Sequence, residues 1–171
     1  VFAVGTLAGW LKAPVRAEHV AFGAVLGPDK KMFKTRAGDT VRLATLLEEA
    51  VERAEAELLR REPEGDAAVR RVLAPKIGIG AVKYSDLAND RIKDYVFDWD
   101  RMLAFDGNTA PYLQYAHARI CSIFRRAELE RASVRSAAIT LDAPEERALA
   151  LRLLAYPTAI DTTLETYSPH K

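Results

Sequence analysis

Apolar residues follow two different spacings along this chain. Between positions 19 and 27, small and apolar residues alternate over the length of a strand, and a Gly-Pro-Asp cluster ends the alternation. After Leu43, apolar residues recur every three or four positions with charged residues between them, which predicts a helix capped by Asp39 or Thr40. The breaker EPEGD at positions 62–66 is predicted to end this helix.

The opening run VFAVGTLAGWL is apolar almost throughout. It has the composition of a signal-peptide core, but no cationic segment precedes it, no small-residue cleavage site follows it, and it is shorter than the ~20 residues that cross a bilayer. We therefore expect a buried helix and no membrane contact, followed by a polar turn around Pro14 and the strand. Because Val1 is neither an initiator methionine nor a capping residue, we expect this element to be cut from a longer one.

The middle of the chain predicts further helices. A short helix is expected over positions 67–78, and the segment 77–87, which contains two glycines, fits a helix or a strand equally well. The clearest helix start follows an aromatic stretch, where Asn108 or Thr109 provides a cap and Pro111 stands in the first turn.

The C-terminal part is helical by pattern. The helix that contains Pro111 is predicted to extend to about Ser136. Another helix is expected over positions 144–154, and Pro157 separates it from a final helical segment that ends at Tyr167. Together these segments predict a helical bundle.

Composition narrows the possible partners. With 171 residues, of which 49% are hydrophobic, the chain can build a core. Lys and Arg total 25 and Asp and Glu total 24, so the net charge of +1 gives no global attraction to nucleic acid or membranes, and contact with a polyanion must be local. The lone Cys121 predicts a buried structural thiol in a reducing compartment, the cytoplasm. The histidines and Cys121 lack metal-ligand spacing, so we expect no metal site.

One local candidate for polyanion binding is the run KMFKTRAGDTVRL at positions 31–43, which places two lysines between the predicted strand and the predicted helix. Ammonium groups just ahead of a helix N-terminus form a cationic site suited to a polyphosphate. Lysine-rich surface loops are common, so a solvated loop is the alternative interpretation.

A second candidate is a stripe of aromatic and basic side chains on the helix that contains Pro111. The stripe consists of Tyr112, Tyr115, Arg119 and Arg126. In one interpretation the tyrosines are half buried in the bundle and the arginines are solvated. In the other, the rings and guanidinium groups contact RNA by stacking and by pairing with phosphates.

Three blocks of the sequence together resemble arginyl-tRNA synthetases in order and spacing: KMFKTRAGDTVRL, GIGAVKYSDLAND and FDWDRMLAFDGNTAPYLQYAHARICSI. The resemblance spans nearly the whole chain and implies an α/β fold that becomes mainly α. It implies that residues 1–43 are the tail of a Rossmann-type catalytic domain with a KMSKS-type loop, that residues 44–95 are a helical connective region similar to a stem-contact region, and that residues 96–171 are part of an anticodon-binding helical bundle.

The resemblance also implies the chemistry of the loop. KMFKT stands where class I synthetases carry KMSKS, with Phe33 and Thr35 in place of the two serines. Lys34 is implied to stabilise the departing pyrophosphate of ATP, while Lys31 and Arg36 help to order the loop. Negative charge moves onto the pyrophosphate in the transition state, where a positioned lysine stabilises it more than in the ground state.

The same resemblance places ATP, accompanied by Mg²⁺, beside the predicted strand. The implied nucleotide contacts are Val20, Phe22, Gly23, Met32 and Thr35. His19 is expected to be structural or close to the adenine, because adenylation in this class needs no general base: the carboxylate of the amino acid attacks phosphorus directly.

The function implied by the resemblance is part of an arginine–tRNA ligase, with L-arginine, ATP and tRNA(Arg) as partners and the stripe as a tRNA contact. The chain lacks the half of the site that carries the HIGH-type motif, so we expect no activity from it alone, and we expect a monomer. The alternative is a truncated paralogue that binds RNA or protein without catalysis. Such a module would have little reason to keep Lys31, Lys34 and Arg36.

Overall fold

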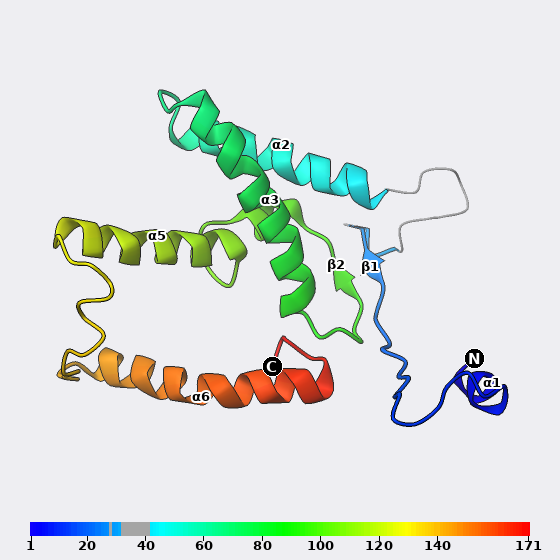
Figure 1. Ribbon diagram of the computed structural model, residues 1–171. Helices are drawn as coiled ribbons and strands as arrows, with labels where there is room; N and C mark the ends of the chain where they lie inside the picture. The colour runs from blue at the N-terminus through cyan, green and yellow to red at the C-terminus, as the bar shows by residue number, and fades with distance from the viewer. Residues whose placement is uncertain (28, 32–41) are drawn as a thin grey trace.

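The computed structural model describes residues 1–27, 29–31 and 42–171 and is mainly helical (Figure 1). The elements are α1 (Phe2–Leu7), β1 (Val25–Leu26), α2 (Leu43–Arg61), α3 (Ala67–Ala88), β2 (Tyr95–Val96), α4 (Trp99–Leu103), α5 (Ala110–Arg126) and α6 (Pro144–Thr166). The two strands pair in parallel, with Val25 opposite Tyr95. The predicted change from a strand-containing start to a mainly helical remainder is confirmed in outline.

The helices α2 and α3 form a hairpin whose contact consists of small residues. Ala50, Ala54 and Ala74 are buried, and Gly78 lies directly against the backbone of α2. Small side chains let two helix backbones approach closely, so that van der Waals contacts extend along both helices. The turn between the helices lies at the predicted breaker, positions 62–66.

α3 is one continuous helix, although the sequence suggested a short helix followed by an ambiguous segment. Asp66 caps its start by accepting a hydrogen bond from the backbone N of Ala68 at 2.7 Å. Pro75 stands inside the helix and removes one backbone hydrogen bond, which commonly ends or kinks a helix. Ala74 and Gly78, on either side of Pro75, are both buried against α2, and this packing offsets the loss.

The start of α2 also differs from the prediction. The helix begins at Leu43 after the extended residue Arg42, later than a cap at Asp39 or Thr40 would place it, and those two residues lie outside the described part of the chain. Leu46 is the first residue of α2 that packs against the hydrophobic core. Arg42 makes no side-chain cap hydrogen bond, and the contact of Leu46 with the core supports the first turn of α2.

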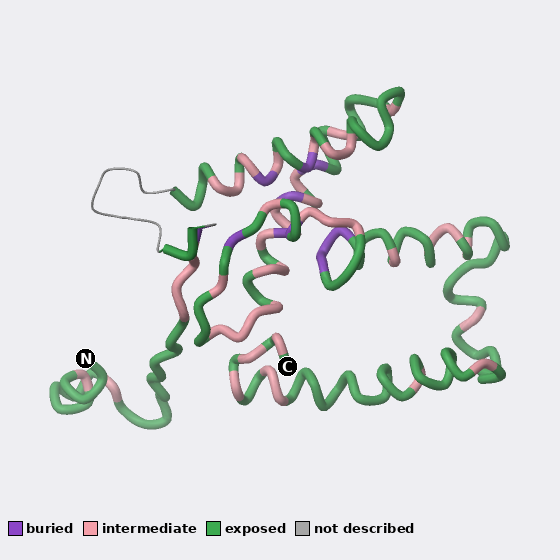
Figure 2. Tube along the Cα trace, turned by 180° about the vertical axis from the view of Figure 1, so that it is seen from behind, coloured by how far each residue is buried: buried purple, intermediate pink, exposed green. Residues whose placement is uncertain are grey.

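The hydrophobic core lies where α3, β2 and α4 meet. Ala81, Phe97 and Met102 are buried there, and the ring of Trp99 packs edge-on against Phe97 with the centroids 4.6 Å apart. Figure 2 shows the buried positions gathered on α2, α3 and the segment that leads into α5. The core fixes the start of α5 relative to α3.

α5 begins where the sequence predicts. Thr109 is buried, and its hydroxyl donates to the carbonyl oxygen of Ala104 at 2.6 Å and accepts from the backbone N of Tyr112 at 3.3 Å. Pro111 stands in the first turn, where its missing N–H is not needed. Of the two predicted caps, Asn108 and Thr109, Thr109 is the one that caps α5.

The two C-terminal helices depart from the prediction in length. α5 ends at Arg126 instead of near Ser136, because Glu128 adopts a φ of 53°, outside the right-handed helical range. α6 is one helix, not two, since Pro157 lies inside it. The leucines and alanines around Pro157 have high helix propensity, which favours continuation of the helix.

α5 and α6 leave their apolar faces open in the part of the chain that the structure describes. Leu113, Ile120 and Ile123, which the sequence assigns to a core face, are all more than half exposed. Every residue of α6 is at least partly exposed. Figure 1 shows the two helices lying apart and joined by the connection of residues 127–143. Among the described residues α5 and α6 do not pack against one another, so the predicted bundle packing is not formed there.

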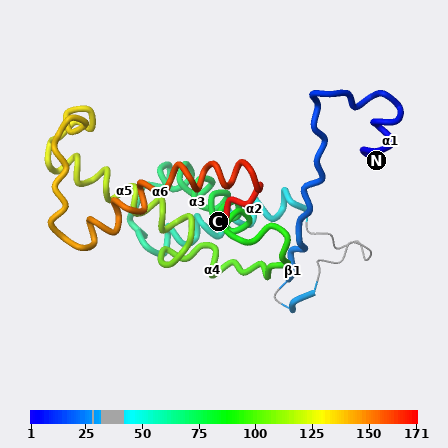
Figure 3. Tube along the Cα trace, turned by 90° about the horizontal axis from the view of Figure 1, so that it is seen from below, coloured from blue at the N-terminus to red at the C-terminus, as the bar shows by residue number. Residues whose placement is uncertain are grey.

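α1 forms as predicted but is not buried. Leu7 is 89% and Trp10 81% exposed, and Figures 1 and 3 show α1 apart from the other elements. The strand predicted over positions 19–27 shortens to β1, because only these residues pair with β2 in the described chain. A two-residue ladder provides no sheet on which α1 can pack. Among the described residues, no helix has both the length and the apolar character that a membrane crossing needs.

Glu57 on α2 holds two arginines of the same helix. Its carboxylate accepts hydrogen bonds from Arg60 at 2.7 Å and from Arg61 at 2.6 Å. The hydrogen bond from Arg60, together with that from Arg61 and against the opposing effect of burial, lowers the pKa of Glu57 from 4.5 to about 2. Because the pKa is lower in the folded state, the stabilisation is complete above pH 4.5 and is lost as the pH falls toward 2.

We therefore expect Glu57→Gln to lower the free energy of unfolding at pH 7 by about 1 kcal/mol, the sum of two largely solvent-exposed pairs. The difference from the unsubstituted protein should disappear as the pH approaches 2. Urea unfolding at several pH values measures it, with Glu52→Gln on the same helix as the control. A constant difference across this pH range would contradict the role of the carboxylate charge.

Candidate functional site

The structure describes the two-lysine loop only at its beginning. The backbone N of Lys31 donates to Oδ1 of Asp29 at 3.1 Å, and its carbonyl oxygen accepts from the backbone N of Gly27 at 2.9 Å. This turn fixes the backbone at the entry to the loop and leaves Lys31 exposed. The remaining predicted loop residues, Met32, Lys34, Thr35 and Arg36, lie outside the described residues.

The segment predicted to flank the adenine lies against the loop between α3 and β2. The backbone N of Gly23 donates to the carbonyl oxygen of Arg91 at 2.7 Å, and a Cβ on Gly23 would lie 2.3 Å from the carbonyl oxygen of Lys93. Val20 and Phe22 are exposed, Phe22 by 82%. The backbone is therefore fixed on one side, while the side chains of Val20 and Phe22 face solvent.

A cleft of about 530 Å³ opens beside this segment. Its lining includes Phe22, Gly23, Asp86, Tyr95 and Tyr167. Burial, and after it the charge of Asp86, raises the pKa of Tyr95 to about 12, so the hydroxyl stays protonated and donates to Oδ1 of Asp86 at 3.4 Å. The lining of the cleft thus contains aromatic rings and the hydrogen bond between Tyr95 and Asp86.

The predicted RNA stripe lies on the exposed surface of α5. Tyr112 and Tyr115 are 43% and 47% exposed, which fits both interpretations of the stripe. Nη1 of Arg119 donates to the hydroxyl of Tyr115 at 3.3 Å, and its guanidinium lies 5.8 Å from the centre of that ring. The structure therefore brings Tyr115 and Arg119 together at the surface, while Tyr112 and Arg126 lie nearer the two ends of the helix.

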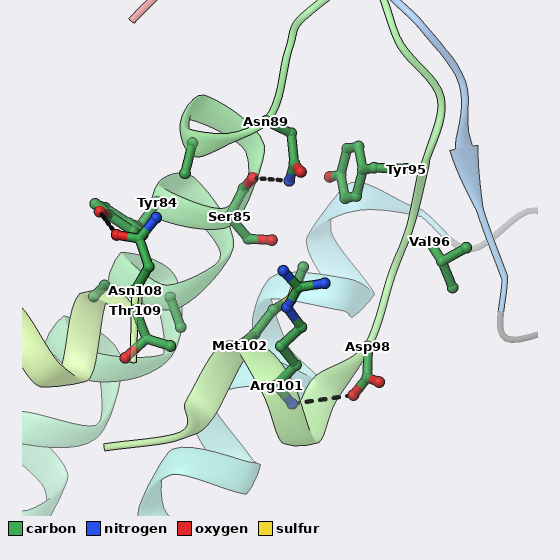
Figure 4. A pocket seen from close by; sticks show the side chains of 13 residues that line it. Tyr84, Ser85, Asn89, Tyr95, Val96, Asp98, Arg101, Met102, Asn108 and Thr109 are labelled. Carbon is green, nitrogen blue, oxygen red and sulfur yellow. Dashed lines mark hydrogen bonds between the residues drawn. The ribbon is translucent and has the colours of Figure 1, made fainter. Parts of the chain in front are cut away.

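A polar pocket of about 360 Å³ between α3, β2 and the start of α5 was not predicted from the sequence (Figure 4). The Tyr84 hydroxyl donates to Oδ1 of Asn108 at 2.5 Å, and the side-chain nitrogen of Asn89 donates to the carbonyl oxygen of Ser85 at 2.6 Å. Because Thr109 caps α5, the side chain of Asn108 is available to Tyr84. For the contact between Tyr84 and Asn108, the sequence contains only one signal: each residue falls in a block that carries the resemblance.

Cys121 is partly exposed and has polar neighbours, so the predicted buried thiol is wrong. Its Sγ lies 3.4 Å from Nε2 of His117 and 2.6 Å from Nη2 of Arg131. The open face of α5 accounts for the exposure. Within residues 1–27, 29–31 and 42–171, no three His, Cys, Asp or Glu side chains gather in a way that could hold a metal ion.

Comparison with known families identifies the parts of this chain. Residues 1–99 match the catalytic domain of class I (R) tRNA synthetases, and residues 113–171 match the DALR anticodon binding domain. The chain belongs to the class I arginyl-tRNA synthetase family. The resemblance inferred from three sequence blocks is thereby confirmed. The two matches are separated by residues 100–112, which contain Met102 of the core and the start of α5.

Curated members of the arginyl-tRNA synthetase family are similar over nearly the whole chain. The arginine–tRNA ligase of Pseudoalteromonas atlantica is 50% identical over 167 residues, which are 98% of this chain and 29% of that protein. The ligase of Citrobacter koseri is 47% identical over 163 residues, 95% of this chain and 28% of that protein. The chain therefore spans less than a third of the length of these relatives.

Solved arginyl-tRNA synthetase structures share the fold. The Thermus thermophilus enzyme aligns with a TM-score of 0.73 at 32% identity, over 98% of this chain and 27% of that one. The Plasmodium falciparum enzyme aligns with a TM-score of 0.75 at 30% identity, over 99% of this chain and 28% of that one. Both alignments extend over almost the full chain, so the exposed helices α1 and α6 belong to the shared fold.

Proposed function

We propose that this chain supplies the loop-bearing end of the catalytic domain and the start of the anticodon-binding domain of an arginine–tRNA ligase. The observation that carries the proposal is the 50% identity to the Pseudoalteromonas atlantica ligase over 98% of the chain. The alternative, a paralogue that binds RNA or protein without catalysis, is not favoured, because the relatives are named as ligases and the loop keeps Lys31, Lys34 and Arg36.

The proposed reaction has two steps. A carboxylate oxygen of L-arginine attacks the α-phosphorus of ATP, the bond to the bridging oxygen breaks, and pyrophosphate leaves with the electron pair. A hydroxyl of the 3′-terminal ribose of tRNA(Arg) then attacks the carbonyl carbon of arginyl adenylate, and AMP leaves. In the first step negative charge grows on the pyrophosphate, so a cation placed there lowers the barrier.

Residues of this chain are proposed to act on the nucleotide side of that step. Lys34 would stabilise the pyrophosphate, Lys31 and Arg36 would order the loop, and Mg²⁺ would accompany ATP. The backbone near Gly23 would flank the adenine. The exposure of Lys31 at the loop entry and the fixed backbone of Gly23 support these roles.

Arginine-dependent ATP–pyrophosphate exchange tests the proposal. We expect exchange from the complete ligase that contains this chain and none from the chain alone, since the HIGH-type half is needed to bind ATP. Arginine-independent or absent exchange in the complete protein would favour the non-catalytic alternative. The monomeric state and the cytoplasmic location remain predictions.

The stripe on α5 is proposed to contact tRNA(Arg), because Tyr115 and Arg119 present a ring and a guanidinium group together to solvent. We expect Arg119→Ala in the complete ligase to weaken tRNA binding by about fivefold to tenfold, the effect of losing one stacking or phosphate contact. Filter binding measures the affinity, and exchange at saturating tRNA should be unchanged.

The control is Arg16→Ala, which removes a side chain that is 80% exposed in the N-terminal segment. It should leave both measurements unchanged. If Arg119→Ala lowered tRNA binding and exchange to the same extent, Arg119 would be a folding residue instead of a tRNA contact.

A further inference from the structure

The loop of residues 89–94 joins α3 to β2 and contacts two segments that are distant in sequence. Toward the N-terminal segment, its Arg91 carbonyl oxygen accepts from the backbone N of Gly23 at 2.7 Å, and Oδ1 of its Asp94 accepts from the backbone N of Ala24 at 2.6 Å. On its other side lies the C-terminal end of α6, as Figure 1 shows. The loop is thus placed between the strand-bearing segment and the last helix.

The side chain of Arg91 connects these two segments directly. Its Nε donates to the carbonyl oxygen of Tyr167, just past the end of α6, at 3.0 Å. Its Nη1 donates to the carbonyl oxygen of Ala21. A guanidinium group presents several N–H donors in one rigid plane, so it can hold two carbonyl groups in a fixed relation.

Further contacts limit movement at the same place. The hydroxyl of Tyr167 donates to Oε2 of Glu18 at 3.3 Å, which ties the end of α6 to the N-terminal segment a second time. A Cβ on Gly23 would come within 2.3 Å of the carbonyl oxygen of Lys93, so the backbones approach as closely as glycine permits. The cleft of about 530 Å³ lies between these contacts and includes both Gly23 and Tyr167 in its lining.

We propose that Arg91 is a positioning residue that fixes residues 20–23 relative to the end of α6. The hydrogen bonds of Arg91 do not depend on the proposed function. Their consequence for ATP binding does rest on it, because there residues 20–23 flank the adenine. A segment held in place before ATP binds loses little freedom on binding, whereas a released segment must be ordered at the expense of affinity. Loss of Arg91 therefore weakens ATP binding without changing the groups that act in the chemical step.

The test uses the complete ligase with Arg91→Gln and Arg91→Lys. Lysine keeps the positive charge but lacks the planar fork. The control is Lys93→Gln in the same loop, where the lysine is 77% exposed and pairs only distantly with Asp90, at 3.7 Å. We expect the KM for ATP in pyrophosphate exchange to rise at least about fivefold in both Arg91 variants, with kcat and the KM for arginine within about twofold of the unsubstituted enzyme.

Hydrogen exchange supplies a second measurement that does not depend on catalysis. Backbone amides of residues 21–24 and of residues 165–168 should both exchange faster in the Arg91 variants and not in Lys93→Gln. A KM for ATP equal to that of the control, full recovery by Arg91→Lys, or faster exchange in only one of the two segments would overturn the proposal. If the unsubstituted protein shows no arginine-dependent exchange of pyrophosphate, the proposed function fails, and the amide measurement alone decides the role of Arg91.

Discussion

Replacing Gly78 by alanine is expected to lower the free energy of unfolding by about 2–4 kcal/mol, because the new Cβ has no space between α2 and α3. That atom would lie 2.3 Å from the carbonyl oxygen of Ala50 and 2.8 Å from the backbone N of Val51. Both are backbone atoms of a packed helix, so the helices must separate. Separation also removes contacts made by Ala54 and Ala74. Urea unfolding followed by circular dichroism measures the loss.

Gly80 of the same helix provides a matched control. A Cβ on Gly80 would meet only the side-chain nitrogen of Gln114, at 3.0 Å, and that flexible side chain can move. Gly80→Ala should be neutral or stabilising by up to about 1 kcal/mol, the gain in helix propensity. Equal effects of the two substitutions would show that the close approach of α2 and α3 does not limit stability.

Replacing Lys34 by alanine in the complete ligase is expected to lower the rate of ATP–pyrophosphate exchange at least about tenfold, or about 1.4 kcal/mol of transition-state stabilisation. The ammonium group is proposed to meet charge that appears on the pyrophosphate only as its bond to the α-phosphorus breaks, so kcat should fall more than the affinity for ATP.

Initial rates at varied ATP concentration separate these effects. Lys12→Ala, which removes an exposed lysine far from the loop in sequence, is the control for the loss of one positive charge. An unchanged exchange rate in Lys34→Ala would remove the catalytic role assigned to that lysine and would leave the family assignment in place.

Local signals in the sequence predicted the boundaries that local chemistry controls. The start of α5 follows from Thr109 and Pro111, and the turn before α3 follows from the breaker at positions 62–66. Packing against α2 compensates for Pro75, and the helix predicted over positions 67–78 continues to Ala88, whereas the break predicted at Pro157 is not formed. A window of sequence does not contain the partner helix, so it cannot show that compensation.

The burial of helices and the contacts between distant segments were the features that the sequence predicted least well. Apolar spacing predicted a core face for α5 and a buried α1, but burial requires a partner surface. Within the described chain α5 has one only at its start, against α3 and α4, and α1 has none. The residue pattern pointed to the two-lysine loop and the stripe, and the family resemblance implied a role for each. Neither pointed to Arg91, whose hydrogen bonds go to backbone carbonyl oxygens of Ala21 and Tyr167 that carry no side-chain signal.

The loop of residues 89–94 also limits how the chain can change length in evolution. One inserted residue adds up to about 3.5 Å of backbone, more than a hydrogen bond can absorb, so an insertion there would separate Arg91 from one of its two carbonyl groups. The exposed connection of residues 127–143 does not have to keep one side chain within hydrogen-bond distance of two distant carbonyl groups. Insertions and deletions among homologues should therefore concentrate in that connection, which is also the better site for grafting a tag or a reporter domain.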